Sequence, residues 1–254
     1  MRKVYIIGIG AGNPDYMTVQ AINALNQADV FFIPNKGAEK AALAKLRTEI
    51  CERFIEKRTY RFVDFETPER AKEFSNYKSN VAEWHARIEE TYEGLLMEEL
   101  AEGECGGFLV WGDPTLYDST LRIIAKISSK GGFALEYDVV PGISSVQALA
   151  ARHRIALNRI GEPVHITTGR RLVEEFPNNL DGVVVLLDGD QAFKRLDQDD
   201  LEIYWGAYLG TEDEILVSGK LSEVMNDIET LRERARREKG WIMDTYLLRK
   251  SDKR

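Results

Sequence analysis

The segment Gly107-Phe108-Leu109-Val110-Trp111-Gly112-Asp113-Pro114 joins an apolar run to a tight turn, and a helical pattern follows it over residues 119–129. A second apolar run, residues 135–140, ends in the turn Pro141-Gly142-Ile143 and again precedes a helical pattern. This order predicts two strands of an open α/β sheet, each with its turn at the carboxyl end. Open α/β sheets bind small molecules at that edge, so the two turns predict a binding site.

A third turn follows the first predicted strand, residues 4–9, and reads Gly10-Ala11-Gly12-Asn13-Pro14-Asp15. Glycines let a backbone approach a ligand with its amide groups exposed, which favours a nucleoside-type ligand over a plain tight turn. The spacing differs from a dinucleotide fingerprint, because Asn13 stands where glycine is required and Pro14 removes an amide donor. An NAD(P)-dependent oxidoreductase is therefore the alternative from a different class of enzyme.

Strand-like and helical patterns alternate along the rest of the chain, which predicts an α/β fold. Further strands are predicted at 28–33, 60–65, 164–167, 183–187, 202–209 and 241–248. Further helices are predicted at 19–25, 41–54, 76–102, 144–152 and 221–237. The length of 254 residues suits two α/β domains, and we place them at residues 1–138 and 139–254.

Composition excludes several classes of function. The net charge of -8 gives no electrostatic footprint for nucleic acid. No apolar window approaches the ~18 residues of a membrane span, and the first strand is too short for a signal peptide, so we expect a cytoplasmic protein. Cys51 and Cys105 are far apart and the histidines His85, His153 and His165 lack ligand spacing, so no metal site is predicted.

Two of the turns carry polar side chains with both a functional and a structural interpretation. Asp113 at a strand end can accept hydrogen bonds from an amino group or a ribose hydroxyl, or it can stabilise its own turn. Ser144 or Ser145 can cap the following helix. Neither serine has an evident histidine and carboxylate partner, which disfavours a serine hydrolase.

Taken together, residues 8–18, Ala28-Asp29-Val30-Phe31, residues 111–114 and residues 140–145 resemble the motifs of the tetrapyrrole methylase family. Members of this family, the class III methyltransferases, transfer a methyl group from S-adenosylmethionine. The resemblance implies two α/β domains with the cofactor in the cleft between them, a tetrapyrrole substrate and a homodimer. Ala11 replaces a proline of the family pattern, Trp111 replaces a glycine, and Pro34-Asn35 stands where some relatives carry an aspartate proposed as a base.

The resemblance also implies which residues bind S-adenosylmethionine and its product S-adenosylhomocysteine. They are Ala11 of the first loop, Trp111, Gly112, Asp113 and Leu116 of the second, Ser144 and Ser145 of the third, Leu187 against the adenine, and Gly210 through its backbone.

Residues 118–123, 152–155, 158–163, 203–210 and 240–249 resemble one branch of the family. Its members methylate C-1 of precorrin-5 and release acetate to give precorrin-6A in cobalamin biosynthesis. The alternative within the family is methylation at another corrin position. A non-catalytic scaffold is disfavoured, because Gly112-Asp113-Pro114 and Pro141-Gly142 are intact. Asp15 and Tyr117 lie nearest to the motifs, but a turn-stabilising and a cleft-lining role explain them more simply, so the catalytic residue is unknown.

A substrate with many carboxylates would be repelled by a chain of charge -8, so its site must be locally basic. Arginines gather after the third motif, at Arg152, Arg154, Arg159, Arg170 and Arg171. Arginine binds carboxylates through two parallel hydrogen bonds and stays charged, so these residues are predicted to bind substrate. The alternative is a solvated helix end and loop.

Overall fold

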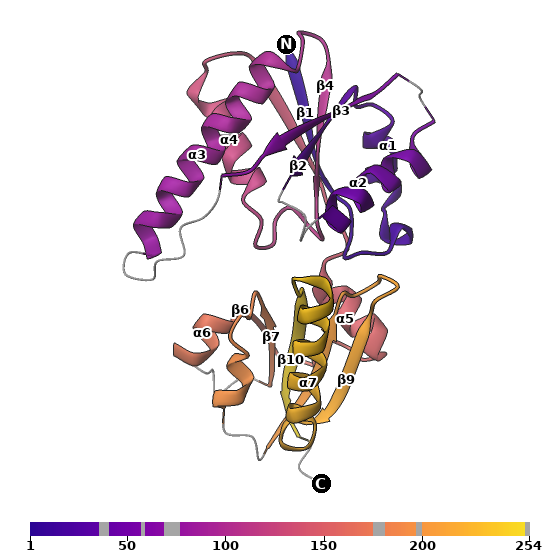
Figure 1. Cartoon of the computed structure of the whole chain (residues 1–254), viewed down its shortest axis with the longest axis vertical. Coiled ribbons are helices and arrows are strands. Elements are labelled where there is room, and N and C mark those ends of the chain that lie inside the picture. The colour runs from indigo at the N-terminus through magenta and orange to yellow at the C-terminus, as the bar shows by residue number, and fades with distance from the viewer. Residues whose placement is uncertain (36–40, 57–58, 69–76, 175–180, 197–199, 252–254) are drawn as a thin grey trace. The chain divides into compact units, whose positions relative to one another are not determined.

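The computed structural model describes residues 1–35, 41–56, 59–68, 77–174, 181–196 and 200–251, which form two compact units (Figure 1). The first unit comprises Met1–Gly10 and Pro14–Ile143, and the second comprises Ala11–Asn13 and Ser144–Arg254. The predicted α/β class is confirmed. The compact units divide after Ile143. The domain boundary between residues 138 and 139 that we expect from the sequence stays a prediction.

The first unit contains a parallel sheet of five strands in the order β3-β2-β4-β1-β5. The strands are β1 (Arg2–Gly8), β2 (Val30–Asn35), β3 (Arg61–Glu66), β4 (Cys105–Val110) and β5 (Leu135–Val140). The helices are α1 (Val19–Leu25), α2 (Ala41–Phe54), α3 (Tyr77–Glu98) and α4 (Thr120–Lys130), with a short 3-10 turn at Pro14–Tyr16. Thr18 caps α1 by accepting a hydrogen bond from the Ala21 amide at 3.1 Å.

Both faces of this sheet are buried. Strand side chains alternate between faces, so Val4 and Ile6 of β1 pack in one core cluster with residues of α3 and α4, while Tyr5 and Ile7 pack in another with residues of α1 and α2. Figure 1 shows these helix pairs on opposite sides of the sheet.

The strand order reverses direction between the neighbours β1 and β4. From β1 the chain continues through α1 to β2 on one side, and from β4 it continues through α4 to β5 on the other side. Open α/β sheets bind ligands at such a switch point, outside the carboxyl ends of the strands. The loops that follow β1 and β4 are those with the predicted motifs.

The second unit contains a mixed sheet in the order β6-β7-β10-β8-β9. Its strands are β6 (Val164–Thr168), β7 (Gly182–Leu186), β8 (Leu201–Ala207), β9 (Ile215–Lys220) and β10 (Asp244–Lys250). Its helices are α5 (Ser145–His153), α6 (Gly169–Glu174) and α7 (Leu221–Lys239), with a 3-10 turn at Ala192–Arg195. Every residue of β7 is buried, as its apolar sequence predicts.

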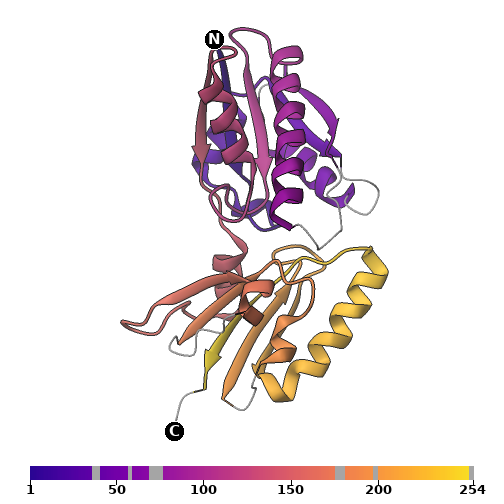
Figure 2. The same cartoon turned by 90° about the vertical axis from the view of Figure 1, so that its left-hand side faces the viewer.

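Helices cover both faces of the second sheet. Ile228 of α7 joins the core cluster of Ile203 and Trp205 in β8, and Figure 2 shows α7 lying over one face of this sheet. Leu149 of α5 lies against Gly206, whose side of β8 is opposite to that of Trp205. α5 therefore packs on the other face.

Candidate functional site

Backbone contacts join the three loops that leave β1, β4 and β5 at one edge of the first sheet. The Gly112 amide donates to the Gly10 carbonyl at 2.8 Å, and the Gly10 amide donates to the Gly112 carbonyl at 3.3 Å. The Gly142 amide donates to Oδ2 of Asp113 at 2.9 Å. The parts of the three motifs at Gly10, Gly112-Asp113 and Gly142 thus form one assembly within the first unit.

Glycine is required where these loops meet because backbone packs directly against backbone. A Cβ placed on Gly142 would lie 2.1 Å from the Gly112 carbonyl oxygen, and one placed on Gly8 would lie 2.6 Å from the Gly142 nitrogen. Both distances are too short for a real Cβ atom. At the strand ends beside the switch point, the backbone of a neighbouring loop therefore occupies the space that a side chain would need. Glycine at these positions therefore lets the backbones of the three loops pack against one another.

Asp113 uses both of its carboxylate oxygens to connect the second loop with the third. Oδ1 accepts hydrogen bonds from the Thr115 amide, at 2.8 Å, and from the Thr115 hydroxyl, while Oδ2 accepts from Gly142. Burial raises the pKa of this carboxyl, but the hydrogen bonds from Thr115 and Gly142 outweigh it and hold the pKa below its ordinary value. A carboxylate has about four acceptor positions, so the three bonds leave capacity for a ligand donor.

Replacing Asp113 by alanine is expected to destabilise the first unit as well as to weaken ligand binding. The Gly142 amide and the Thr115 groups lose their acceptor, at a cost of about 1–3 kcal/mol. Urea unfolding of D113A measures this cost, with D64A as the control because Asp64 is an exposed aspartate of β3. Equal stability of D113A and D64A would contradict the role of Asp113 as a link between loops.

The serines of the third loop begin α5, as the sequence predicts. Ser144 is its N-cap, accepts a hydrogen bond from the Val146 amide at 3.2 Å, and forms a capping box with Gln147. The Ser145 hydroxyl accepts a hydrogen bond at 3.1 Å from the hydroxyl of Thr245 in β10. Both hydroxyls therefore have structural roles in the second unit.

Leu187 directly follows β7 and combines two unusual properties. Its φ is 54°, in the left-handed region that bulky residues rarely adopt, and its side chain is 67% exposed. Residues held in strained backbone cluster at active sites and ligand-binding sites. Gly210, after β8, also has a positive φ of 78°, and its amide donates to Glu214 at 2.8 Å.

Asp188, which sequence reasoning missed, holds the turn that presents Leu187. Its Oδ2 accepts hydrogen bonds from the Tyr246 hydroxyl at 2.6 Å and the Ala192 amide at 2.7 Å, and Oδ1 accepts from the Asp190 amide at 3.2 Å. The side chain is buried. A sequence signal existed, since Asp188-Gly189-Asp190 is a turn pattern directly after a buried strand.

The predicted arginines do not form one cluster. Arg159 lies at the amino end of β7, where it pairs with Asp181 at 2.5 Å and donates to the Lys250 carbonyl at 2.8 Å. Arg170 and Arg171 follow the carboxyl end of β6, which is parallel to β7, so the length of β7 separates them from Arg159. In the second unit Arg152 pairs with Glu214 at 2.6 Å.

Two of these arginines differ in their surroundings. Arg171 pairs with Glu174 at 3.0 Å. Arg154 ends α5 with a φ of 58° and is exposed, and within the described ranges no ion pair holds its guanidinium. Ion pairs within the second unit therefore already engage Arg152, Arg159 and Arg171.

Asp15 and Tyr117 are the acidic and phenolic residues nearest to the motifs. Asp15 pairs with Arg53 at 2.5 Å. Tyr117 is 45% exposed with a φ of 54°, and burial raises the pKa of its hydroxyl above the ordinary value. Over the ranges that the structure describes, no group of three or more histidine, cysteine or acidic residues could hold a metal ion. The same ranges contain no helix long and apolar enough to cross a bilayer.

Residues 3–225 match the family model described as Tetrapyrrole (Corrin/Porphyrin) Methylases. This match covers most of the chain and includes all three loops and both sheets up to β9. The chain therefore belongs to the tetrapyrrole methylase family, and the family predicted from the motifs is confirmed.

Two relatives are similar over almost the full length. The chain is 57% identical over 250 residues to precorrin-6A synthase [deacetylating] from a Sinorhizobium species, covering 98% of this chain and 96% of the relative. It is 37% identical to a cobalamin-synthesis-related protein (CobF) from Corynebacterium diphtheriae, whose crystal structure has a TM-score of 0.85 and covers 99% of this chain and 100% of that one. The predicted resemblance to the deacetylating branch is confirmed.

A third likeness shows the fold alone. Uroporphyrin-III C-methyltransferase from Thermus thermophilus, in a crystal structure complexed with S-adenyl homocysteine, is 16% identical with a TM-score of 0.57. The alignment covers 97% of this chain and 96% of that chain. The fold predicted from the resemblance is thereby confirmed.

Proposed function

We propose that this protein is an S-adenosylmethionine-dependent methyltransferase that methylates C-1 of precorrin-5 and releases acetate to give precorrin-6A in cobalamin biosynthesis. The observation that carries the proposal is the 57% identity to precorrin-6A synthase [deacetylating] over 98% of the chain. Identity at this level extends through the loops and both units, so it bears on the substrate as well as on the cofactor. The homodimer and the cytoplasmic location expected from the sequence are part of the same proposal.

The residues present fit the cofactor. The Asp113 carboxylate has acceptor capacity left for a hydroxyl or amino group, and exposed Leu187 offers an apolar surface for a base. We place the cofactor contacts at Ala11, Trp111, Gly112, Asp113, Leu116, Ser144, Ser145, Leu187 and Gly210. When bound, S-adenosylmethionine supplies a methyl group on a positively charged sulfur.

The chain itself contributes chiefly orientation. Correct alignment of reacting groups can lower a barrier by ~7 kcal/mol or more without a covalent enzyme intermediate. The rigid joining of the three loops through Gly10, Gly112, Asp113 and Gly142 suits that task. Acetate release needs a water that attacks the acetyl carbonyl, and we assign no residue as the base that activates it.

Substrate carboxylates require cationic partners that are not already engaged. Arg154 satisfies this condition, because it is exposed and makes no ion pair within the described part of the chain. Arg170, at the start of α6, remains a proposed substrate ligand that would exchange its present interaction for one with the substrate. Arg152, Arg159 and Arg171 could serve only by exchanging their present carboxylate partners for those of the substrate.

Calorimetry with S-adenosylhomocysteine and with NAD tests the cofactor assignment. We expect S-adenosylhomocysteine to bind without metal and NAD not to bind, because Asn13 and Pro14 disrupt the dinucleotide fingerprint. Binding of NAD alone would favour the oxidoreductase and overturn the proposal.

Replacing Leu187 by glycine separates its ligand role from its structural role. Glycine adopts a φ of 54° without strain, so the stability of the fold should be kept or raised. The loss of apolar contact should weaken S-adenosylhomocysteine binding about tenfold, as expected for ~1.5 kcal/mol of side-chain burial. I160A serves as the control, since Ile160 is fully exposed in the same unit. Unchanged affinity of L187G would remove Leu187 from the site.

A further inference from the structure

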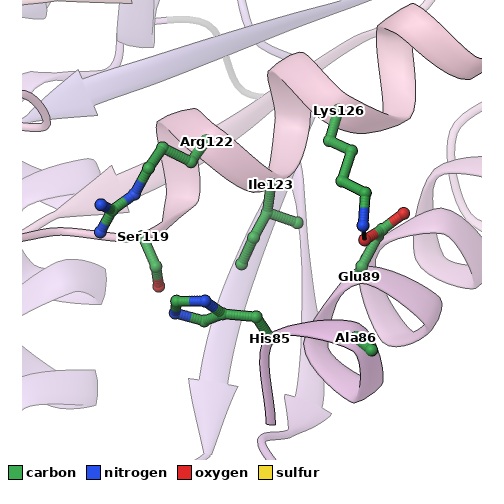
Figure 3. Close-up of a pocket in the computed structure, with 7 residues that line it drawn as sticks. All are labelled: His85, Ala86, Glu89, Ser119, Arg122, Ile123 and Lys126. Carbon is green, nitrogen blue, oxygen red and sulfur yellow. Dashed lines mark ion pairs between the residues drawn. The ribbon is translucent and has the colours of Figure 1, made fainter. Parts of the chain in front are cut away.

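A cavity of about 300 Å³ lies between α3 and α4 in the first unit (Figure 3). Its lining consists of His85, Ala86 and Glu89 from α3, of the N-cap residue Ser119, and of Arg122, Ile123 and Lys126 from α4. None of these residues belongs to the three loops. The volume exceeds that of a single carboxylate and suits a short acidic side chain with accompanying water.

The cavity lies near the edge of the sheet where the three loops meet. α4 begins directly after the second loop, which leaves the carboxyl end of β4, and Ser119 is the N-cap residue of α4. α3 precedes β4 in the chain, so His85 in its first half lies toward the same edge. A ligand held at the loops could therefore extend a substituent into the cavity.

The electrostatics of the lining favour an anion. Glu89 is the lining carboxylate, and it pairs with Lys126 at 2.6 Å and with Lys130 at 2.5 Å. Hydrogen bonds from these lysines lower the pKa of Glu89, so it stays ionised and is already neutralised. The guanidinium of Arg122 therefore gives the lining of the cavity a net positive charge, and such a charge attracts anionic groups.

Polar donors at one end of the cavity are suitably placed for a carboxylate. Figure 3 shows the Lys126–Glu89 pair at one end and the His85 ring and Ser119 at the other, with the side chain of Ile123 between them. The Ser119 hydroxyl does not cap α4, because Asp118 accepts the Thr120 amide instead at 2.7 Å. Arg122 donates only one long hydrogen bond, of 3.3 Å, to the Asp118 carbonyl, which leaves most of its donors for a ligand.

We propose that this cavity binds a carboxylate side chain of the tetrapyrrole substrate, with Arg122 as the principal cation and His85 and Ser119 beside it. The inference rests on the proposed function for the identity of the substrate, and it adds a site in the first unit to the arginines of the second. A planar guanidinium binds a carboxylate through two parallel hydrogen bonds, which gives both charge and direction.

The test compares R122Q with the parent protein and with R87Q. Arg87 is an exposed arginine of α3 that pairs with Glu83 and does not line the cavity, so R87Q removes the same charge nearby. Binding of uroporphyrin III, a stable porphyrin with acetate and propionate side chains, is titrated at low and high salt. S-adenosylhomocysteine affinity is measured on the same samples.

We expect R122Q to bind uroporphyrin III about tenfold more weakly at low salt and with less salt dependence, as for loss of one charge-assisted hydrogen bond. R87Q and the affinity of all three proteins for S-adenosylhomocysteine should be unchanged. Equal porphyrin binding by R122Q and R87Q would overturn the inference. Failure of the parent to bind S-adenosylhomocysteine would instead count against the proposed function.

Inorganic phosphate distinguishes a substrate side chain from a free anion as the occupant. If the cavity holds the porphyrin side chain, phosphate should compete with porphyrin in the parent and lose this effect in R122Q. Phosphate binding that leaves porphyrin affinity unchanged would assign the cavity to a free anion and contradict the proposal.

Discussion

Replacing Gly142 by alanine is expected to abolish ligand binding and to destabilise the first unit strongly. The added methyl group would lie 2.1 Å from the Gly112 carbonyl oxygen and 2.8 Å from the Gly8 carbonyl carbon. Both neighbours are backbone atoms held by strands β1 and β4, so neither can move like a flexible side chain. The third loop must shift, which breaks the hydrogen bond from Gly142 to Asp113. Overpacking of this kind costs about 1–3 kcal/mol or more.

G94A provides a matched control for G142A. Gly94 lies within α3 and has no atom within 4 Å of the position of an added Cβ. Alanine at an open helical position should stabilise the protein by about 0.5–1 kcal/mol. Thermal unfolding and S-adenosylhomocysteine titration of both variants measure the effects. If G142A retained the parent's stability and affinity, close packing of the three loops could not be the basis of the site.

Replacing Arg232 by methionine is expected to cost about 3–5 kcal/mol of folding free energy, because it leaves a buried carboxylate without its cation. Arg232 and Asp244 pair at 2.9 Å, and each side chain is 5% exposed. Asp244 would keep only the hydrogen bond from the Trp205 indole, at 3.0 Å, among the side-chain bonds described. Arg232 also donates to the Asp188 carbonyl at 2.7 Å, so the turn that presents Leu187 should loosen as well.

The control for R232M is R234M, because Arg234 is an exposed arginine on the same helix. Its substitution should change stability by no more than about 0.5 kcal/mol. Urea unfolding followed by tryptophan fluorescence measures the stability, and Trp205, one of the four tryptophans, bonds to Asp244. Equal midpoints for R232M and R234M would contradict the stabilising role of the buried pair.

Elements with strong apolar periodicity could be predicted from the sequence. The bounds of α2 and β5 coincide with their predictions, since each has a regular pattern of buried positions. α3 was predicted to reach residue 102 but ends at Glu98. The side chains of Arg61 and Arg2 bind the Glu99 and Leu100 carbonyls, both at 2.5 Å, and thereby replace the hydrogen bonds of a further helical turn.

Strand β9 was missed because apolar and polar residues do not alternate along its sequence. Its residues are partly buried or exposed, and Gly219 interrupts the apolar run. The short helix α6 was missed as well, since its six residues are too few to show a period.

Site features that depend on contacts distant in sequence could not be predicted. The turn pattern Asp188-Gly189-Asp190 marks Asp188 in the sequence, but its hydrogen bond from the Tyr246 hydroxyl, 58 positions away, does not follow from that pattern. The arginines are close in sequence but distant in space, so their proximity in the sequence wrongly suggested one basic patch. In the structure, the length of β7 separates Arg159 from Arg170 and Arg171. The positions of the arginines in the sequence do not predict this separation.

The most direct test of the proposed function is a product assay with purified protein, S-adenosylmethionine and precorrin-5. The proposal predicts that acetate, S-adenosylhomocysteine and precorrin-6A form in equal amounts, because methyl transfer to C-1 and loss of the acetyl group belong to one reaction. Methyl transfer without acetate would instead indicate a corrin methylase acting at another position, and absence of both products would contradict the assignment.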